Sequence, residues 1–295
     1  MGQHFPERQP RSWGRATPVE RLRWRHPAAA VTASARIVQA GPELPLTGGN
    51  TIMSETTGQL FDWVDVRAMP ESVADDVISR FRALDDLSAT VADALDALGI
   101  HGCVGSSTLF PTLPDERIVG RAITLRNSPS RMDTYRAVTD GSWLMAEIHA
   151  VEIAEPGDVV VVSGLPEVSN MGGIVAALAR RGEIAGAVVD GAVRDVAQSR
   201  RRGFPIWTRD VTPRTGKWRG SSVEINGTIS VAGVTVASGD LVIADETGVC
   251  FVPHALIDDV LARCEAIDKK EAVMFSAIAD GLPTADVIRQ LYGLD

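Results

Sequence analysis

An arginine and an aspartate stand side by side, as Arg194 and Asp195, directly after the apolar segment "AVVDGAV". A guanidinium group binds the oxygens of organic acids, and a carboxylate is a preferred ligand of hard divalent cations. Upstream, Gly172 and Gly173 precede a helical pattern, where free backbone N–H groups and the helix dipole attract a carboxylate or a phosphate. Together these residues predict a binding site for a small anion and a cation. A second interpretation stays open, in which Asp195 only caps the following helix and Arg194 is a solvated surface charge.

Strands and helices alternate along the segment that must position these residues. The order strand, helix, strand predicts parallel strands joined by crossovers, and ligands collect at the carboxyl ends of such strands. We expect Asp190–Gly191 to end its strand in a tight turn at this edge. The predicted elements are a strand at 158–164, a helix at 174–182, a strand at 184–190 and a helix at 193–203.

Further elements are predicted on both sides of this segment, and together they indicate an α/β protein. The helix predicted at 88–99 carries Thr90 and Asp93 at capping-box spacing and has Gly99 as its stop. The other predicted helices are 71–84, one around 141–150, 254–279 and 284–292, and the other predicted strands are 118–126, 228–233, 240–245 and 249–253.

The composition excludes several classes of function. The 295 residues are 45% hydrophobic and 23% charged, and the net charge of −9 opposes a nucleic-acid surface, which needs a basic stripe. The apolar runs are too short for a membrane span, no secretion signal is present, and we expect a cytoplasmic protein without membrane contact. Neither the three cysteines nor the five histidines have the spacing of a zinc site, and no nucleotide-binding loop occurs.

The first 52 residues differ from the remainder. They contain seven Arg, no Lys and three Glu, a net charge of +4 that leaves −13 for the rest of a chain whose total is −9. Their turn-rich stretches lack apolar periodicity and bury too little surface to offset the entropy of ordering. We expect 1–52 to be a disordered or non-native extension, with an Arg-rich targeting segment as the alternative, and 53–295 to form one domain.

Several separated blocks, taken in order, resemble the RraA-like family, which includes the divalent-metal-dependent 4-hydroxy-4-methyl-2-oxoglutarate aldolases. The resemblance spans about 88–295. It implies an α/β domain with α/β/β/α layers, of the swivelling β/β/α type, that assembles as a homotrimer or as a hexamer of two trimers. The blocks are "SATVADALDALG", "IVGRAITL", "EPGDVVVVSG", "GGIVAALARRGEIAGAVVDGAVRDV", "GFPIWTRDVTPR" and "VASGDLVIADETGVCFVP".

The resemblance also implies roles for individual residues. In the aldolases of this family the working motif is an Asp, then twenty residues, then an Arg-Asp pair. Arg194 and Asp195 match the pair, which implies that Arg194 binds the oxo and carboxylate oxygens of the substrate and that Asp195 ligates Mg²⁺ or Mn²⁺. The residues of the loop before the helix, Gly172, Gly173 and Ile174, are expected to bind substrate, and Gly173 stands where the family has the first Asp.

A C-terminal acidic residue of the family reaches the site of a neighbouring subunit, and Glu271 is the candidate for it here. The alternative for Glu271 is a solvated helix face. The basic loop "RTGKWRG", which starts at Arg214, is expected to be either a solvated loop or a cationic lid over an acid substrate.

The implied activity is carbon–carbon lyase chemistry on a small 2-oxo or 3-oxo acid through a metal-stabilised pyruvate enolate. It is either aldol cleavage of a 4-hydroxy-4-methyl-2-oxoglutarate type of substrate or decarboxylation of an oxaloacetate-like compound. Decarboxylation removes no hydroxyl proton, so it tolerates Gly173 better. The alternative is a non-catalytic regulator that acts by protein–protein binding, like the family members that inhibit RNase E.

Overall fold

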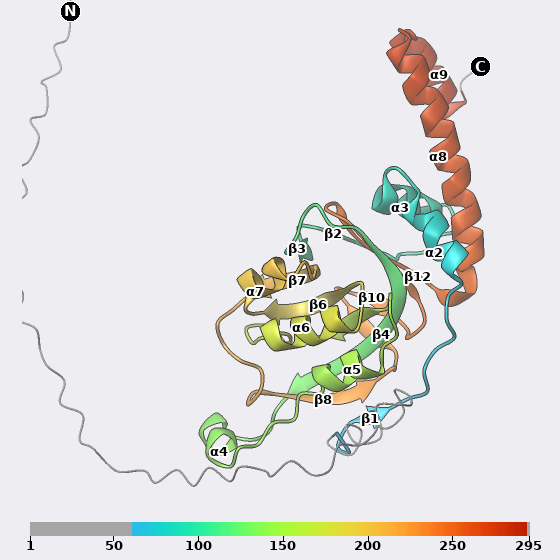
Figure 1. The fold of residues 1–295 in the computed structure, drawn as a ribbon. Helices are drawn as coiled ribbons and strands as arrows, with labels where there is room; N and C mark the ends of the chain where they lie inside the picture. The colour runs from blue at the N-terminus through green and yellow to red at the C-terminus, as the bar shows by residue number, and fades with distance from the viewer. Residues whose placement is uncertain (1–60, 294–295) are drawn as a thin grey trace, which may run out of the picture. The chain divides into compact units, whose positions relative to one another are not determined.

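Four parallel strands form the centre of the sheet in residues 61–293, which are the residues that the computed structural model describes (Figure 1). Helix α6 (Gly173–Arg181) connects β5 to β6, and α7 (Val196–Arg201) connects β6 to β7. The predicted α/β class is confirmed, whereas the expectations for 1–52 fall outside the described residues. The strands lie side by side in the order β4 (Ile118–Pro129), β5 (Val159–Ser163), β6 (Gly186–Val193) and β7 (Ile206–Val211).

Strand β4 is long enough to have two neighbours on one edge. Its first half pairs antiparallel with β11 (Leu241–Ala244), and its second half pairs antiparallel with β8 (Gly220–Ile225). Beyond β11 follow β12 (Gly248–Val252) and the edge strand β2 (Cys103–Gly105). The remaining strands are β1 (Asp65–Val66) beside β8, β3 (Phe110–Pro111) beside β7, and the hairpin of β9 (Ile229–Val231) and β10 (Val234–Val236).

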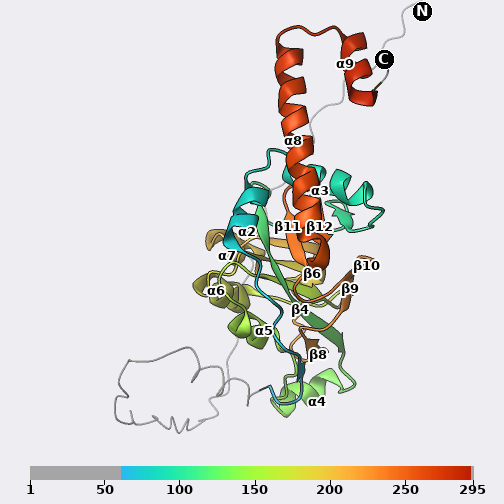
Figure 2. The same cartoon turned by 90° about the vertical axis from the view of Figure 1, so that its right-hand side faces the viewer.

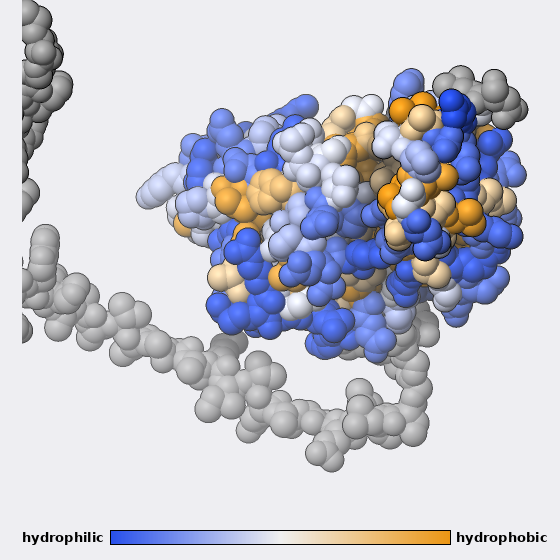
Figure 3. Space-filling view, turned by 90° about the horizontal axis from the view of Figure 1, so that it is seen from above, coloured by the Kyte–Doolittle hydropathy of each residue, from blue (hydrophilic) through white to orange (hydrophobic). Residues whose placement is uncertain are grey.

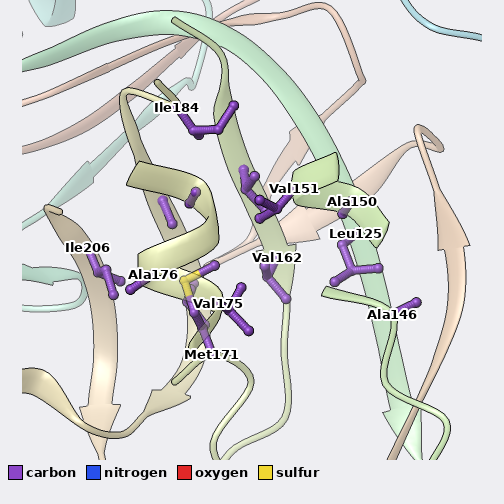
Figure 4. Packing of buried hydrophobic residues seen from close by; sticks show 14 of the residues in the cluster. Leu125, Ala146, Ala150, Val151, Val162, Met171, Val175, Ala176, Ile184 and Ile206 are labelled. Atoms are coloured by element: carbon purple, nitrogen blue, oxygen red, sulfur yellow. The ribbon is translucent and has the colours of Figure 1, made fainter. Parts of the chain in front are cut away.

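The central strands are apolar at successive positions, and their side chains fill both faces of the sheet. On β5, Val160 and Val162 pack towards α5 (Glu147–Ile153) and α6, whereas Val159 and Val161 pack towards β9, β10 and β12. Figure 4 shows the first of these clusters, with Val175 of α6 near Val162. Because both faces are covered, these strands are continuous apolar runs rather than alternating ones.

A second layer of helices covers the outer face of β11 and β12. Helices α2 (Asp75–Arg82), α3 (Leu87–Asp96) and α8 (Ile257–Ala279) pack there around Leu241 and Val252. The order of layers is therefore α/β/β/α, as the resemblance implied. In Figure 2, α8 extends beyond the sheet and α9 (Thr284–Tyr292) folds back beside it. Two short helices, α4 (Thr134–Thr139) and the 3₁₀ helix His254–Leu256, complete the described chain.

None of the helices in residues 61–293 combines the length and the apolar character that a membrane span requires.

The expected turn at Asp190–Gly191 is wrong, because β6 continues through it to Val193. The pairing with β7 instead shifts register between Val189 and Ala192. A Cβ atom at Gly191 would lie 2.5 Å from Asn170 Nδ2 and 2.7 Å from the Leu165 carbonyl oxygen. The glycine is therefore required by the close approach of the loop after β5, not by a turn.

The expected capping box at Thr90 is also wrong. Helix α3 already begins at Leu87, and its first turn is capped from a distant part of the chain. The Asp245 carboxylate accepts hydrogen bonds from the Ser88 backbone N–H at 2.9 Å and from the Ser88 hydroxyl at 2.7 Å. A cap from the loop before β12 cannot be found from local spacing. The helix expected around 141–150 starts later than predicted, at Glu147.

Candidate active site

A cavity of about 480 Å³ lies at the carboxyl ends of the parallel strands. The segments after β5, β6 and β7 all contribute to its wall, as the strand order predicted. Apolar side chains of Trp143, Met145 and Met171 form one side. The polar lining consists of Glu147, Ser169, Gly172, Gly173, Arg194, Asp195, Gln198, Thr215 and Lys217, with Ile174 at the rim, where it is 73% exposed.

Asp195 does not cap the helix that follows it. Its backbone is left-handed, with φ of 58°, and its side chain makes no capping hydrogen bond to α7. Oδ2 instead accepts a hydrogen bond from the Gly173 backbone N–H at 3.1 Å and lies 3.5 Å from Arg194 Nε. Among residues 61–293, Oδ1 has no hydrogen-bond partner. The carboxylate, which lines the cavity, is thus oriented through one oxygen and has the other free of hydrogen bonds to the described residues.

The two glycines before α6 leave room for the side chains of Arg194 and Asp195, because neither has a Cβ atom. A Cβ atom at Gly172 would lie 3.1 Å from Asp195 Oδ2 and 3.2 Å from Arg194 Nε. A Cβ atom at Gly173 would lie 3.2 Å from Asp195 Cβ and 3.1 Å from Gln198 Oε1. The Gly173 N–H, which we expected to be free for a ligand, is already bound by Asp195. A carboxylate side chain could therefore enter at Gly173 only if Gln198 and Asp195 moved.

Asn170, a residue that the sequence did not single out, holds the loop between β5 and α6 against β6. Its side chain is fully buried and donates to the carbonyl oxygens of Leu165, Val168 and Ala192. It also accepts from the Leu165 N–H at 2.7 Å. The backbone continues this pairing, because Arg194 N–H donates to the Met171 carbonyl oxygen at 3.1 Å. These bonds place the glycines beside the Arg-Asp pair.

Glu147 is the second residue that the sequence did not single out. It is the first residue of α5, it lines the cavity, and its Oε2 atom is shielded from water without a hydrogen-bond partner in the described residues. Burial raises the pKa of the Glu147 carboxyl to about 7, while its own backbone N–H and the charge of Arg194 act in the opposite direction. A single acid inside the apolar run "WLMAEIHAV" was the available sequence signal.

The basic loop from Arg214 contributes to the cavity through Thr215 and Lys217. It is anchored on the loop after β5, because Gly216 N–H donates to the Ser169 carbonyl oxygen at 3.1 Å. Lys217 Nζ lies 5.3 Å from the centre of the Trp218 ring. The loop thus places a cation at the wall of the cavity.

Glu271 lies elsewhere in its own chain. It belongs to α8 and is not part of the cavity that holds Arg194. Burial raises the pKa of its carboxyl, and the negative charges of Asp86, Asp93 and Asp268 act in the same direction. A role for it at the site of a neighbouring subunit stays a prediction.

Two other hollows border the described chain. One of about 420 Å³ lies on the other side of Arg194 and Asp195, so the pair is accessible from two directions. Another, of about 670 Å³, lies at the amino ends of the strands, and its buried cation, Arg121, is already paired with Asp158 and Glu155. No group of three or more His, Cys, Asp or Glu residues able to hold a metal ion occurs within residues 61–293. A cation at Asp195 would therefore keep most of its water.

Known proteins are similar in sequence to the segment that contains this site. The family model described as RraA-like, Aldolase/RraA, matches residues 88–251. A protein of Halalkalibacterium halodurans, named "Putative 4-hydroxy-4-methyl-2-oxoglutarate aldolase", is 32% identical over 209 residues, which cover 70% of this chain and 90% of that protein.

Solved structures share the fold. An uncharacterized protein from Pseudomonas syringae pv. tomato aligns with a TM-score of 0.62 and 26% identity, covering 74% of this chain and 98% of that one. RraAS2 of Streptomyces coelicolor, described as an unusual member of the RNase ES inhibitor RraA protein family, aligns with a TM-score of 0.57 and 27% identity, covering 70% of this chain and 98% of that one.

Proposed function

This chain belongs to the RraA-like family, and we propose that it is a divalent-metal-dependent carbon–carbon lyase that acts on a small oxo acid. The observation that carries the proposal is the pair at the end of β6, where the Asp195 carboxylate and the Arg194 guanidinium lie together at a cavity of about 480 Å³. The name of the Halalkalibacterium halodurans relative supports the aldolase class.

The donor set fits a hydrated hard cation. Mg²⁺ is commonly held by one or two carboxylates and keeps several waters, and the Asp195 carboxylate, whose Oδ1 has no hydrogen-bond partner within residues 61–293, suits it as the ligand beside Arg194. The hydrogen bond from Gly173 N–H fixes the orientation of the carboxylate, as the neighbours of metal ligands commonly do. A bound Mg²⁺ or Mn²⁺ would supply positive charge beside the oxygen on which negative charge develops.

The remaining residues suit a small dianionic acid. The Arg194 guanidinium would donate to the oxo and carboxylate oxygens at one end of the substrate, and Lys217 would face a second carboxylate across the cavity. The apolar side of Trp143, Met145 and Met171 excludes water from the reacting carbons. We expect oxo acids of about the size of oxaloacetate to bind and long-chain acids to be rejected.

Cleavage of the bond between C3 and C4 of a 2-oxo acid leaves the electron pair on an enolate, and protonation at C3 then gives pyruvate. In aldol cleavage a base must first take the proton of the C4 hydroxyl, whereas in decarboxylation CO₂ leaves directly. Because Gly173 provides no carboxylate, we expect decarboxylation of oxaloacetate to be the faster reaction.

The test is pyruvate release from oxaloacetate and from 4-hydroxy-4-methyl-2-oxoglutarate, in Mg²⁺, in Mn²⁺ and in chelator. We expect activity with either metal, none in chelator, and loss of at least about a hundredfold in Asp195→Asn, because one ligand is removed. Mn²⁺ binding measured by electron paramagnetic resonance should weaken in the same variant. Asp259→Asn, at an exposed carboxylate of α8, is the control. Absence of Mn²⁺ binding together with inactivity on both acids contradicts the proposal.

A second candidate function is regulation by protein–protein contact without catalysis. The similarity to RraAS2, from a family of RNase ES inhibitors, favours it, and the net charge of −9 suits a basic partner segment. An inactive protein that lowers the cleavage rate of an RNase E-type enzyme in a purified assay would support this function. It would replace the lyase proposal.

A further inference from the structure

The place of Glu147 in the first turn of α5 accounts for only part of its carboxyl group. Its Oε2 atom is shielded from water and has no hydrogen-bond partner within residues 61–293. A buried polar atom without a partner destabilises the fold, so such an atom at a cavity wall points to a ligand. An apolar residue at this position would leave no buried polar atom without a partner.

The surroundings of Glu147 keep its protonated and ionised forms close in free energy near neutral pH. Burial is the largest influence and raises its pKa to about 7, and the opposing charge comes from Arg194. Asp195 and Lys217 line the same cavity, and Glu152 and His149 lie on the same helix. A carboxyl group with a pKa near the working pH both donates and accepts protons efficiently.

Gly173 removes the carboxylate that the aldolase motif would place in this cavity, and the space there is occupied. The Gln198 side chain and Asp195 Cβ lie within 3.2 Å of where a side chain at Gly173 would start. A proton-transferring group must therefore come from another element. Apart from Asp195, Glu147 is the one carboxylate that lines the cavity in the described chain.

We propose that Glu147 is the acid–base residue of this cavity, in place of the carboxylate that Gly173 lacks; the inference rests on the proposed lyase function. In decarboxylation, the bond between C3 and C4 breaks, CO₂ leaves, and the protonated Glu147 donates its proton to C3 of the enolate. The resulting carboxylate regains a proton from water. In aldol cleavage, the ionised Glu147 first accepts the proton of the C4 hydroxyl and then returns it to C3.

The test uses Glu147→Gln, which keeps size and polarity but cannot carry the proton. Exchange of the pyruvate methyl protons for deuterium reports proton transfer at C3 without the cleavage step. Nuclear magnetic resonance follows this exchange with Mg²⁺ as the metal, because paramagnetic Mn²⁺ would broaden the signals. We expect exchange and pyruvate release to fall by about a hundredfold or more, with Mn²⁺ binding unchanged. The limb of the pH profile near pH 7 should disappear.

Glu152→Gln is the matched control. Glu152 lies on the same helix and also has a shielded oxygen without a hydrogen bond, but it does not line the cavity and its Oε2 lies 3.8 Å from His149 Nδ1. It should keep both exchange and the pH profile. An active wild type whose Glu147→Gln variant retains exchange overturns the inference and leaves the lyase function standing. A wild type that binds no Mn²⁺ and cleaves neither acid overturns both.

A second, independent feature is a pair of thiols on neighbouring strands. Cys103 of β2 and Cys250 of β12 are directly opposite in register, and their Sγ atoms lie 3.1 Å apart. The adjacent bond from Phe251 N–H to the Gly102 carbonyl oxygen makes Cys103–Cys250 a non-hydrogen-bonded pair, in which side chains approach most closely. The backbone separation of such a pair falls within the range that a disulfide spans.

The geometry points to a reversible disulfide between Cys103 and Cys250. Cys103 is exposed, and its hydrogen bond with Cys250 lowers the pKa of its thiol, so it is the group that an oxidant reaches first. A peroxide would oxidise Cys103 to a sulfenic acid and release one water. The Cys250 sulfur would then attack it, and a second water would leave as the disulfide forms.

The test is treatment of the whole protein with hydrogen peroxide, alkylation under denaturing conditions and peptide mass spectrometry. We expect a cross-linked pair of peptides that contain Cys103 and Cys250, and we expect a dithiol to separate them. The buried Cys264 should stay a free thiol and be alkylated after denaturation. Cys103→Ser should abolish the cross-link and Cys264→Ser should leave it intact. Alkylation of both thiols after oxidation of the folded protein overturns the assignment.

Discussion

Asp195 reaches the cavity because its backbone is left-handed. A φ of 58° is uncommon for a residue other than glycine, although aspartate tolerates it better than most. This conformation turns the side chain away from α7 and towards the first N–H of α6, where the helix dipole stabilises negative charge. The strained backbone at the end of β6 is therefore consistent with a binding function.

Gly173→Ala tests the space beside this carboxylate. The added Cβ atom lies 3.2 Å from Asp195 Cβ and must displace it, so we expect Mn²⁺ affinity to fall by about tenfold. Titration followed by electron paramagnetic resonance measures it. Gly105→Ala, where the nearest atom would be 3.9 Å away, is the control for the same substitution in open space. Unchanged affinity in Gly173→Ala would show that the contact does not orient Asp195.

Glu147→Gln should also change the pH dependence of stability. Because the carboxyl pKa rises from 4.5 to about 7 on folding, the folded state holds the proton more tightly, and stability falls as pH rises between these values. Above pH 7 the substitution should raise the free energy of unfolding by up to about 3 kcal/mol, and below pH 4.5 by much less. Urea denaturation at both pH values measures the difference. Equal effects at both would show that Glu147 ionises normally.

At the scale of elements, the loop between β5 and α6 decides where the site forms. It carries no helix or strand of its own, so its shape depends on hydrogen bonds within the loop and on backbone bonds to β6. The Asn170 amide binds Leu165 within the loop and the Ala192 carbonyl oxygen of β6, and Gly191 leaves room for it in the strand. The loop therefore packs closely against β6, and this packing sets the position of Gly172 and Gly173 before α6.

Asn170→Ala should lower the free energy of unfolding by about 3 kcal/mol, because several buried backbone groups lose their partners. Asn170→Asp keeps the shape but removes the three donor bonds to carbonyl oxygens, and it should cost a similar amount. Urea denaturation measures both, with Ser107→Ala at an exposed position as the control. Wild-type stability in the two variants would show that the loop is held by other contacts.

At the scale of the whole molecule, α8 and α9 carry apolar side chains that the other residues of 61–293 leave uncovered. Val273 is 67% exposed, Phe275 60% and Tyr292 70%. The surface seen from above is otherwise mainly hydrophilic, with separate hydrophobic patches (Figure 3). Apolar residues gathered on one projecting element commonly mark a contact with another chain. The homotrimer or hexamer that the resemblance implies stays a prediction.

Light scattering on the purified protein should give a mass of three or six chains. If Glu271 completes the site of a neighbour, Glu271→Gln and Asp195→Asn should each be inactive alone. A mixture refolded together should regain roughly a quarter of wild-type activity, because subunits of a closed ring combine at random. No recovery in the mixture, or full activity of Glu271→Gln, would place Glu271 on a solvated face instead.

Most elements could be predicted from the sequence, because the spacing of apolar residues is local and reports directly on helices and strands. The runs that became β5, α6 and β6 were found in this way, and so was the Arg194–Asp195 pair at the end of a strand. Strand β8 was missed because its six residues "GSSVEI" alternate weakly and gain their order only from pairing with β4. The family resemblance assigned Arg194 and Asp195 to one motif.

The tertiary structure decided what these residues can do. Whether Asp195 caps its own helix or faces a cavity depends on Gly173, twenty-two positions away, and no local pattern contains that contact. The same holds for Glu147, whose lost hydration follows from strands and loops that enclose it, and for the thiols of Cys103 and Cys250, which meet across two strands. Sequence spacing determines elements because their forces act over a few residues, whereas pKa values, empty space and pairing depend on neighbours that only the folded chain brings together.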